Sequence, residues 1–368
     1  MDSKTTDGVP RTRRYAVLTG GFLGEMYGKT AQGVLRYRSD EVVAVIDERH
    51  AGKRVCDVVP NLRSTAPIVA SFDEASAYAP DSLLIGVATD GGRIPPEFRR
   101  TILSAVDAGL EIVSGLHELL ADDEEILARA TRSGARLWDV RVPPQDISIF
   151  SGAAYALAQD VVLAVGSDCA VGKMTALLEI ERAARAAGAR ARFAATGQTG
   201  IMITGTGIAV DRVIADFVAG AAEKLTLEHA AGADVVLVEG QGAIFHPAYG
   251  PVTLGLLYGS APDVLLLCDR PSSRQIAGFS TAIPDLASLV RSYEDVVAHL
   301  KPARVAAIAL DTSAYDASGA VAIIAATARA TGLPVDDPVR NGAERLWAAL
   351  ETALRATPKA ASRAPVST

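Results

Sequence analysis

The sequence predicts an α/β protein with an N-terminal Rossmann-like parallel-sheet domain followed by a P-loop NTPase-like parallel-sheet domain. Its 368 residues are enough for about two domains. Short β-branched runs alternate with longer helical stretches, which is typical of parallel α/β units. Both halves also begin with the same order of features, a strand, a glycine turn and a helix. These observations together predict two parallel-sheet α/β domains in series.

The first domain is expected over residues 14–145. A helix is predicted at Pro96–Ala108, where a pair of prolines suits a helix N-terminus. The domain ends near Arg141–Pro144, because two adjacent prolines cannot extend a central strand. Its predicted strands are Tyr15–Leu18, Glu41–Ile46, Leu83–Val87 and Glu111–Val113.

The second domain is expected over residues 158–356. It opens with a strand at Val161–Val165, a glycine turn and a helix at Met174–Ala187 that Gly188 ends. A last helix is predicted at Gly342–Leu354. Further strands are predicted at Arg192–Ala195, Val235–Val238, Val264–Cys268 and Arg304–Ala309. Residues 1–13 and 357–368 have no periodicity and are expected to be flexible tails.

Composition narrows the class of partner. The chain has 36 basic and 43 acidic residues and a net charge of −7, without a long basic run, so we expect no nucleic-acid partner. No apolar stretch is long enough to span a bilayer, and the first residues lack the apolar core of a signal peptide, so we expect no membrane contact and no export. Three widely spaced cysteines indicate neither a disulfide framework nor a zinc knuckle. We therefore expect a cytoplasmic protein.

The main chemical motif follows the first strand of the second domain. A glycine-rich loop directly before a helix offers backbone N–H groups to a phosphate chain, and its lysine reaches the terminal oxygens. We expect this loop to bind ATP and Lys173 to act in catalysis; an ordinary turn with an exposed lysine is the alternative. The predicted cofactor-binding residues are Gly166, Ser167, Asp168, Cys169, Ala170, Val171, Gly172, Lys173, Met174 and Thr175.

Carboxylates and hydroxyls near this loop are candidates for a Mg²⁺ site. Glu239 follows the apolar run Val235–Val238, where a buried parallel strand can deliver a metal ligand. The loop has Met174 where Ser or Thr usually follows the lysine, so Thr175 or Asp168 is expected to complete the site. Asp211 and Asp216 are further candidate carboxylates, with surface positions as the alternative.

Substrate contacts are expected where polar residues and glycines follow predicted strands. His246 is a candidate for binding a carboxylate or transferring a proton, with a structural role as the alternative. Arg270 is a candidate clamp for a carboxylate or a phosphate, with a surface position as the alternative. The full predicted substrate-binding set is Gln198, Thr199, Gly240, Gln241, His246, Arg270, Gly21 and Gly91.

The front domain carries part of a dinucleotide fingerprint. Gly21 and Gly24 match the last two glycines of G-x-G-x-x-G, but Thr19 stands at the first position. A bound NAD is therefore one interpretation. We favour the other, a Rossmann-shaped scaffold that contributes to a substrate cleft.

The motifs resemble known proteins. Gly166–Lys173 with Val238-Glu239-Gly240 resembles dethiobiotin synthetase and its P-loop relatives, although Met174 replaces their Thr and the front domain has no counterpart there. Gly172–Thr175, Ala195–Ile203 and Glu239–Pro247 resemble a P-loop family long called a domain of unknown function, whose members carry a Rossmann-like domain in front. That resemblance implies either D-glutamate N-acetylation or ATP-dependent amide formation.

We expect an ATP- and Mg²⁺-dependent ligase that joins a small carboxylate to an amine through an acyl phosphate. Glu239 would hold the metal, and Lys173 would neutralise charge on the phosphates. The alternative is acyl transfer from acetyl-CoA to an amino acid such as D-glutamate. A nucleotide-dependent binding or regulatory protein is a third interpretation. The expected partners are small-molecule carboxylate and amine substrates, and we expect a homo-oligomer.

Overall fold

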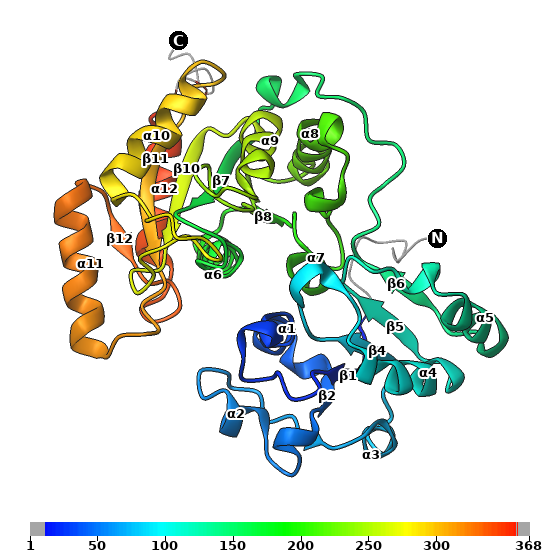
Figure 1. Ribbon diagram of the computed structural model, residues 1–368. Helices are drawn as coiled ribbons and strands as arrows, with labels where there is room; N and C mark the ends of the chain where they lie inside the picture. The colour runs from blue at the N-terminus through cyan, green and yellow to red at the C-terminus, as the bar shows by residue number, and fades with distance from the viewer. Residues whose placement is uncertain (1–11, 358, 360–368) are drawn as a thin grey trace. The chain divides into compact units, whose positions relative to one another are not determined.

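A computed structural model describes residues 12–357 and 359 (Figure 1). The chain divides into two compact units. Unit 1 comprises the residues up to Val142 together with Gln198–Arg212, and unit 2 comprises Pro143–Gly197 and the residues from Val213 onward.

Unit 1 is built on a parallel sheet that has, within the described residues, six strands in the order β3-β2-β1-β4-β5-β6. This order is that of a Rossmann-like sheet, so the predicted fold of the front domain is confirmed. The strands are β1 (Tyr15–Leu18), β2 (Val42–Ile46), β3 (Ile68–Val69), β4 (Ser82–Ile85), β5 (Glu111–Ser114) and β6 (Leu137–Asp139).

Helix α4 of unit 1 buries an apolar face against this sheet. In α4 that face includes Ile102 and Val106, which join Leu83, Ile85 and Ile112 of the sheet in one core cluster. A 3-10 turn at Pro96–Phe98 precedes α4, as the proline pair predicted. The helices are α1 (Lys29–Tyr37), α2 (Val55–Val58), α3 (Phe72–Ser76), α4 (Arg99–Asp107), α5 (Glu124–Ser133) and α7 (Gln198–Thr204).

Unit 2 has a second parallel sheet, in the order β12-β11-β10-β7-β9-β8 among the residues described. The strand that leads into the glycine loop, β7, pairs with β9 on one side and β10 on the other. Its Val and Leu side chains are buried on both faces, as in other parallel sheets. The strands are β7 (Asp160–Gly166), β8 (Ala191–Ala194), β9 (Val235–Val238), β10 (Val264–Asp269), β11 (Arg304–Leu310) and β12 (Val335–Asp336).

Capping residues define where two helices of unit 2 begin. Asp285 accepts a hydrogen bond from the N–H of Ser288 at the start of α10, and Asp316 accepts one from Gly319 at the start of α11. Gly332 ends α11 in the left-handed conformation. The helices are α6 (Lys173–Ala186), α8 (Val218–Ala230), α9 (Gly250–Ser260), α10 (Leu286–Ala298), α11 (Ala317–Thr331) and α12 (Glu344–Arg355).

The structure differs from the sequence-based prediction in the shortest strands and in one connection. β3, β6 and β12 were not predicted, because two or three residues are too few to establish an alternating pattern. Residues 198–212 were predicted to lie in the second domain, and their contacts in the structure group them with unit 1. The reason is that α7 packs on α1, and the Arg38 guanidinium donates to the carbonyl oxygens of Met202 and Ile203.

Two residues of the expected tails have defined contacts. The Arg13 side chain is buried and donates from Nε to Glu111 Oε2 at 2.6 Å, and it also lies over the ring of Trp138. Lys359 donates to Asp263 Oδ2 at 2.9 Å. The rest of the two predicted tails lies outside the described residues, apart from Thr12 and Thr357.

Candidate nucleotide-binding site

The loop between β7 and α6 has the backbone of a phosphate-binding loop. Ala170 and Gly172 adopt positive φ angles of 53° and 90°, which turn the chain sharply into the helix. Within the described part of the chain, no hydrogen bond engages the backbone N–H groups of Ala170, Val171 and Gly172. Together with the N-terminus of α6, these groups are suited to an anion, so the loop fits the phosphate chain that its sequence predicted.

Lys173 lies inside this loop rather than at the surface. Its side chain is buried, and Nζ donates to the carbonyl oxygens of Asp168 and Gly242, each at 2.8 Å. Burial lowers the pKa of Lys173 from its ordinary value, because the ammonium is removed from water. The two carbonyls orient the ammonium across the loop and make it a charge available to phosphate oxygens.

Two glycines leave the room that Lys173 needs. A Cβ on Gly166 would lie 2.8 Å from Nζ. A Cβ on Gly240 would lie 1.7 Å from the carbonyl oxygen of Ala164, in β7, and 3.0 Å from Cδ of Lys173. The predicted residue Gly240 therefore acts by letting the segment after β9 approach β7 closely.

Glu239 lies where sequence reasoning expected it, directly after β9. Its carboxylate is buried, and Oε2 accepts hydrogen bonds from the N–H groups of Thr196 and Gly197 at 2.9 and 3.0 Å. Thr196 Oγ1 donates to the carbonyl oxygen of Glu239 at 2.8 Å and accepts from Gln241 Nε2 at 3.2 Å. The ends of β8 and β9 thus hold one ordered carboxylate on the side of the sheet where the loop lies.

Glu239, Thr175 and Asp168 carry oxygen atoms, which are the donors that Mg²⁺ bound to phosphate prefers. Oxygen ligands at the end of a buried strand, beside a cationic loop, are the usual environment of such a metal. Thr175 lies half-buried in the first turn of α6. Glu239, Thr175 and Asp168 remain the predicted ligands. Asp211 instead forms an ion pair with Arg141 within unit 1, and Asp216 is exposed in a 3-10 turn.

Asp168 fastens the loop to a neighbouring segment. Its Oδ1 accepts the N–H of Cys169 at 2.7 Å, and its Oδ2 accepts the N–H of Ala277 at 2.7 Å. Both oxygens of this buried carboxylate are therefore engaged by backbone groups. The position of the loop relative to the segment after β10 depends on this side chain.

The Nε2 atom of His246 faces the Asp168 carboxylate. His246 Nδ1 accepts the N–H groups of Ala248 and Tyr249 at 3.1 and 3.2 Å, and Nε2 lies 3.7 Å from Asp168 Oδ1. Because Nδ1 is an acceptor, this network assigns the ring hydrogen to Nε2. The ring is nearly fully buried and packs against Tyr249 and Phe279. His246 is thus a donor aimed at the edge of the phosphate loop.

The same hydrogen bonds argue against a metal at His246. Asp168, Cys169 and His246 offer ligand atoms that all lie within 4.8 Å of one another. A metal on Nε2 would require the ring hydrogen on Nδ1, where it would face two backbone N–H donors. The geometry therefore favours hydrogen-bond donation over metal binding at this histidine.

The remaining predicted substrate residues are distributed between the two units. Arg270, after β10, pairs with Asp311, with Nε 2.8 Å and Nη2 2.7 Å from Oδ2. Gln198 and Thr199 belong to unit 1, where Gln198 Nε2 donates to Thr30 Oγ1 at 2.6 Å. Gly21 and Gly91 also lie in unit 1, in turns with positive φ angles after β1 and β4.

Two residues that hold the loop in place were not predicted from the sequence. Tyr293, in α10, donates from its hydroxyl to the carbonyl oxygen of Gly166 at 2.7 Å and accepts the N–H of Ile244 at 3.2 Å. Asp269 accepts a hydrogen bond from Ser167 Oγ at 2.5 Å. Asp269 is a carboxylate at the end of β10, beside the strand that leads into the loop, and this position could have identified it from the sequence. Nothing in the local sequence marks Tyr293.

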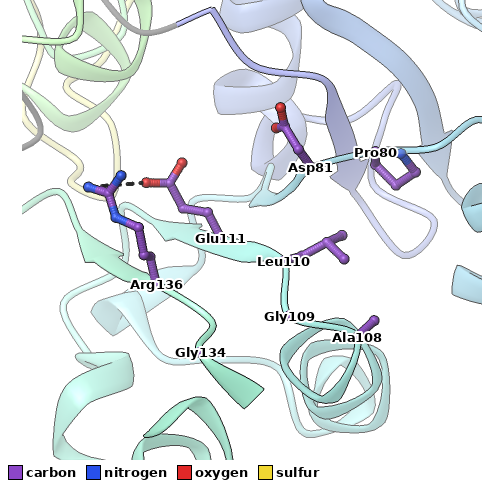
Figure 2. A pocket seen from close by; sticks show the side chains of 8 residues that line it. All are labelled: Pro80, Asp81, Ala108, Gly109, Leu110, Glu111, Gly134 and Arg136. Carbon is purple, nitrogen blue, oxygen red and sulfur yellow. Dashed lines mark ion pairs between the residues drawn. The ribbon is translucent and has the colours of Figure 1, made fainter. Parts of the chain in front are cut away.

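A cavity of unit 1 lies away from the strand ends that bind ligands in α/β folds. Its volume is about 310 Å³, and Figure 2 shows Arg136 reaching toward Glu111 at its side. Pro80 and Asp81 precede β4, and Leu110 precedes β5, so the cavity is at the amino ends of these strands. Ligands of such sheets bind at the carboxyl ends, so this cavity is not the candidate site.

Sequence comparison assigns both parts of the chain to one family. The family model described as a P-loop domain of unknown function, DUF1611_C, matches residues 148–347. The companion Rossmann-like domain, DUF1611_N, matches residues 48–143. This chain belongs to the DUF1611 family. The family resemblance expected from the motifs is confirmed, and the resemblance to dethiobiotin synthetase stays a prediction.

Relatives of this DUF1611 chain match over nearly their whole length. A protein of Tritonibacter scottomollicae named D-glutamate N-acetyltransferase is 37% identical over 339 residues, which are 89% of this chain and 97% of the relative. A protein of Pseudoalteromonas with the same name is 31% identical over 338 residues, 91% of this chain and 98% of the relative. The crystal structure of a DUF1611 protein from Anabaena variabilis is 37% identical, has a TM-score of 0.88, and the match covers 92% of this chain and 99% of that chain.

Among the helices that the structure describes in this DUF1611 chain, none has the length and apolar character needed to cross a membrane.

Proposed function

We propose that this protein is an enzyme that acylates the amino group of an acidic amino acid, D-glutamate first among them. The observation that carries the proposal is that two relatives named D-glutamate N-acetyltransferase match about nine-tenths of this chain and nearly all of their own length. Because the match spans both domains, an activity shared with these relatives is the simplest explanation. The loop around Lys173 supports a role for a phosphate-bearing co-substrate in the reaction.

Acetyl-CoA is the acyl donor that the relatives' name favours. The amine nitrogen of D-glutamate would attack the thioester carbonyl, the C–N bond would form, and the C–S bond would break. The ammonium loses one proton to water before attack, and the attacking nitrogen gives up a second proton, which the leaving thiolate gains to become the free thiol. In this route Lys173 and the loop N–H groups hold phosphates of CoA, and His246 Nε2–H donates to an oxygen of the bound ligand.

An ATP-dependent ligase is the second candidate function. The position of the Glu239 carboxylate favours it. A buried, ordered carboxylate beside a phosphate loop suits Mg²⁺, which neutralises the charge of transferring phosphates. A carboxylate such as acetate would attack the γ-phosphorus with release of ADP. The amine would then displace phosphate from the acyl phosphate. Both routes form the same amide, and they differ in what activates the acyl group.

The deciding experiment supplies D-glutamate with either acetyl-CoA, or acetate, ATP and Mg²⁺, to the purified full chain. Amide product is measured by mass spectrometry, and free thiol, ADP and phosphate are measured in parallel. We expect thiol to appear in step with N-acetyl-D-glutamate without ATP. ADP in step with amide would instead establish the ligase, and no amide from either donor would contradict the proposed function. L-Glutamate and D-alanine serve as control acceptors.

A further inference from the structure

A cavity of unit 2 includes Asp269, the residue that accepts a hydrogen bond from Ser167 of the phosphate loop. Its volume is about 490 Å³, which falls in the range of small-molecule sites. It is lined by the segment after β10, the residues that lead into α10, and one face of α11. All of these elements belong to unit 2, and α10 packs against α11.

One side chain joins this cavity to the loop. Asp269 lines the cavity, and its Oδ1 accepts the hydrogen bond from Ser167 Oγ at 2.5 Å. Ser167 is the first residue after Gly166, and Gly166 pairs with Cys268 in the sheet. The cavity therefore adjoins the β10 side of the loop through Asp269.

The lining suits a flat heterocycle attached to a sugar. Ile283, Leu286 and Ile323 provide apolar walls against which the faces of a base can pack. Asp269 and Thr327 provide polar atoms for an amino-bearing edge or for hydroxyl groups. Burial raises the pKa of the Asp269 carboxyl, while the hydrogen bond from Ser167 opposes that shift. Ser273, Arg274 and Asp285 also line the cavity, so its apolar walls are combined with polar and charged groups that can contact a sugar or a phosphate.

We propose that this cavity binds the adenosine part of the nucleotide whose phosphates lie on the loop around Lys173. The inference rests on the proposed function, in which the co-substrate is acetyl-CoA or ATP. Both molecules carry adenosine attached to a phosphate chain, so the cavity serves either one. The cavity binds the base and sugar, and the loop binds the phosphates.

Three ligands separate the two parts of the site. Inorganic triphosphate carries phosphates alone, whereas ATP and CoA add adenosine and present it on different phosphate chains. Binding of each ligand to the full-length protein is measured by calorimetry. We expect the wild-type protein to bind ATP or CoA at least tenfold more tightly than triphosphate; equal affinity would overturn the proposal. Whichever of ATP and CoA binds more tightly is identified as the natural source of the adenosine group.

Two exposed alanines of α11 give a matched pair of variants. Ala330 lines the cavity, and Ala322 does not, although both are exposed on the same helix. Ala330→Trp should weaken binding of the adenosine ligand about tenfold and leave triphosphate affinity unchanged. Ala322→Trp should leave both affinities unchanged. Ala326→Trp, at a less exposed position that also lines the cavity, should have a larger effect of the same kind.

Lys173→Ala separates a failure of this cavity from a failure of the proposed function. It should weaken triphosphate and the adenosine ligand alike, because both use the loop. If the folded Ala330→Trp and Ala326→Trp variants bind the adenosine ligand as tightly as the wild-type protein does, the cavity assignment is overturned. The loop assignment stays intact in that case. Absence of binding for all three ligands would overturn both.

Discussion

Nζ of Lys173 lies 2.8 Å from the carbonyl oxygen of Gly242, 69 positions further along the chain. This contact joins the start of α6 to the segment that follows β9. The same segment carries Glu239, whose carboxylate is held by the N–H groups of Thr196 and Gly197. A cation and an anion are thus fixed beside one loop by backbone groups, an arrangement that prepares the site before any ligand arrives.

Replacing Lys173 by Met should strongly reduce turnover while the fold persists. Met keeps most of the apolar stem but removes the ammonium, so phosphate affinity or kcat/KM should fall on the order of 100-fold. The change is measured by calorimetry and by amide formation. Lys224→Met is the matched control, because Lys224 pairs with Asp146 and Glu228 away from the loop. Wild-type phosphate affinity in Lys173→Met would contradict the phosphate-loop assignment.

On the ligase route, Glu239→Gln should alter the Mg²⁺ dependence of nucleotide binding. The amide oxygen can still accept the N–H groups of Thr196 and Gly197, but the negative charge is lost. We expect the Mg²⁺ concentration for half-maximal nucleotide binding to rise about tenfold or more. Glu223→Gln is the control, since Glu223 is also buried but accepts hydrogen bonds from Ser151 and Ala154. An identical Mg²⁺ titration in Glu239→Gln would remove Glu239 from the metal site.

His246 can be tested with two amides that imitate different ring nitrogens. Asn imitates the Nδ1 acceptor that receives the N–H groups of Ala248 and Tyr249, and Gln imitates the Nε2–H donor. If the donor matters for function, Gln should retain more of kcat than Asn, by about tenfold. Thermal unfolding of both variants checks the loop around His246. Equal kcat values in two folded variants would show that His246 is structural only.

Gly240→Ala should destabilise unit 2. The added Cβ would lie 1.7 Å from the carbonyl oxygen of Ala164, so β7 and the segment after β9 must separate. We expect a loss of about 1–3 kcal/mol in the free energy of unfolding, measured with urea. Gly24→Ala is the control, because its Cβ would meet Val58 at an ordinary 3.6 Å. Unchanged stability in Gly240→Ala would contradict the close approach.

Cys268 should make stability fall at alkaline pH. Burial raises the pKa of its thiol from 9.0 to about 12. Since the folded pKa is the higher one, the contribution is complete below pH 9 and is lost as the pH rises toward 12. Burial also raises the pKa of Tyr15 to about 12, so the wild-type protein loses stability from both groups.

The thiol contribution is isolated by urea unfolding at pH 7 and pH 10.5. Cys268→Ala should lose less free energy of unfolding between these two pH values than the wild-type protein does. Cys56→Ala serves as the control, because Cys56 is only half-buried. Equal losses in wild type and Cys268→Ala would mean that the thiol does not titrate as the burial indicates.

Local sequence was enough for the fold class and for the centre of the candidate site. The strand-loop-helix order around Gly166 and Lys173 depends on neighbouring residues only, and so do the carboxylate after Val235–Val238 and the turn after Tyr15–Leu18. Apolar runs of four or more residues were found within one or two positions of the observed strands. The periods of strands and helices are local properties, so they can be seen without a fold.

Contacts between distant segments required the tertiary structure. Tyr293 reaches Gly166 across 127 positions, and Ser167 reaches Asp269 across 102. The attachment of residues 198–212 to unit 1 depends on Arg38, which lies more than 160 positions earlier. Such pairs leave no periodic signal, because each partner is chosen by packing and hydrogen bonding in three dimensions. Sequence therefore placed the loop on its strand, and only the fold decided which side chains hold it there.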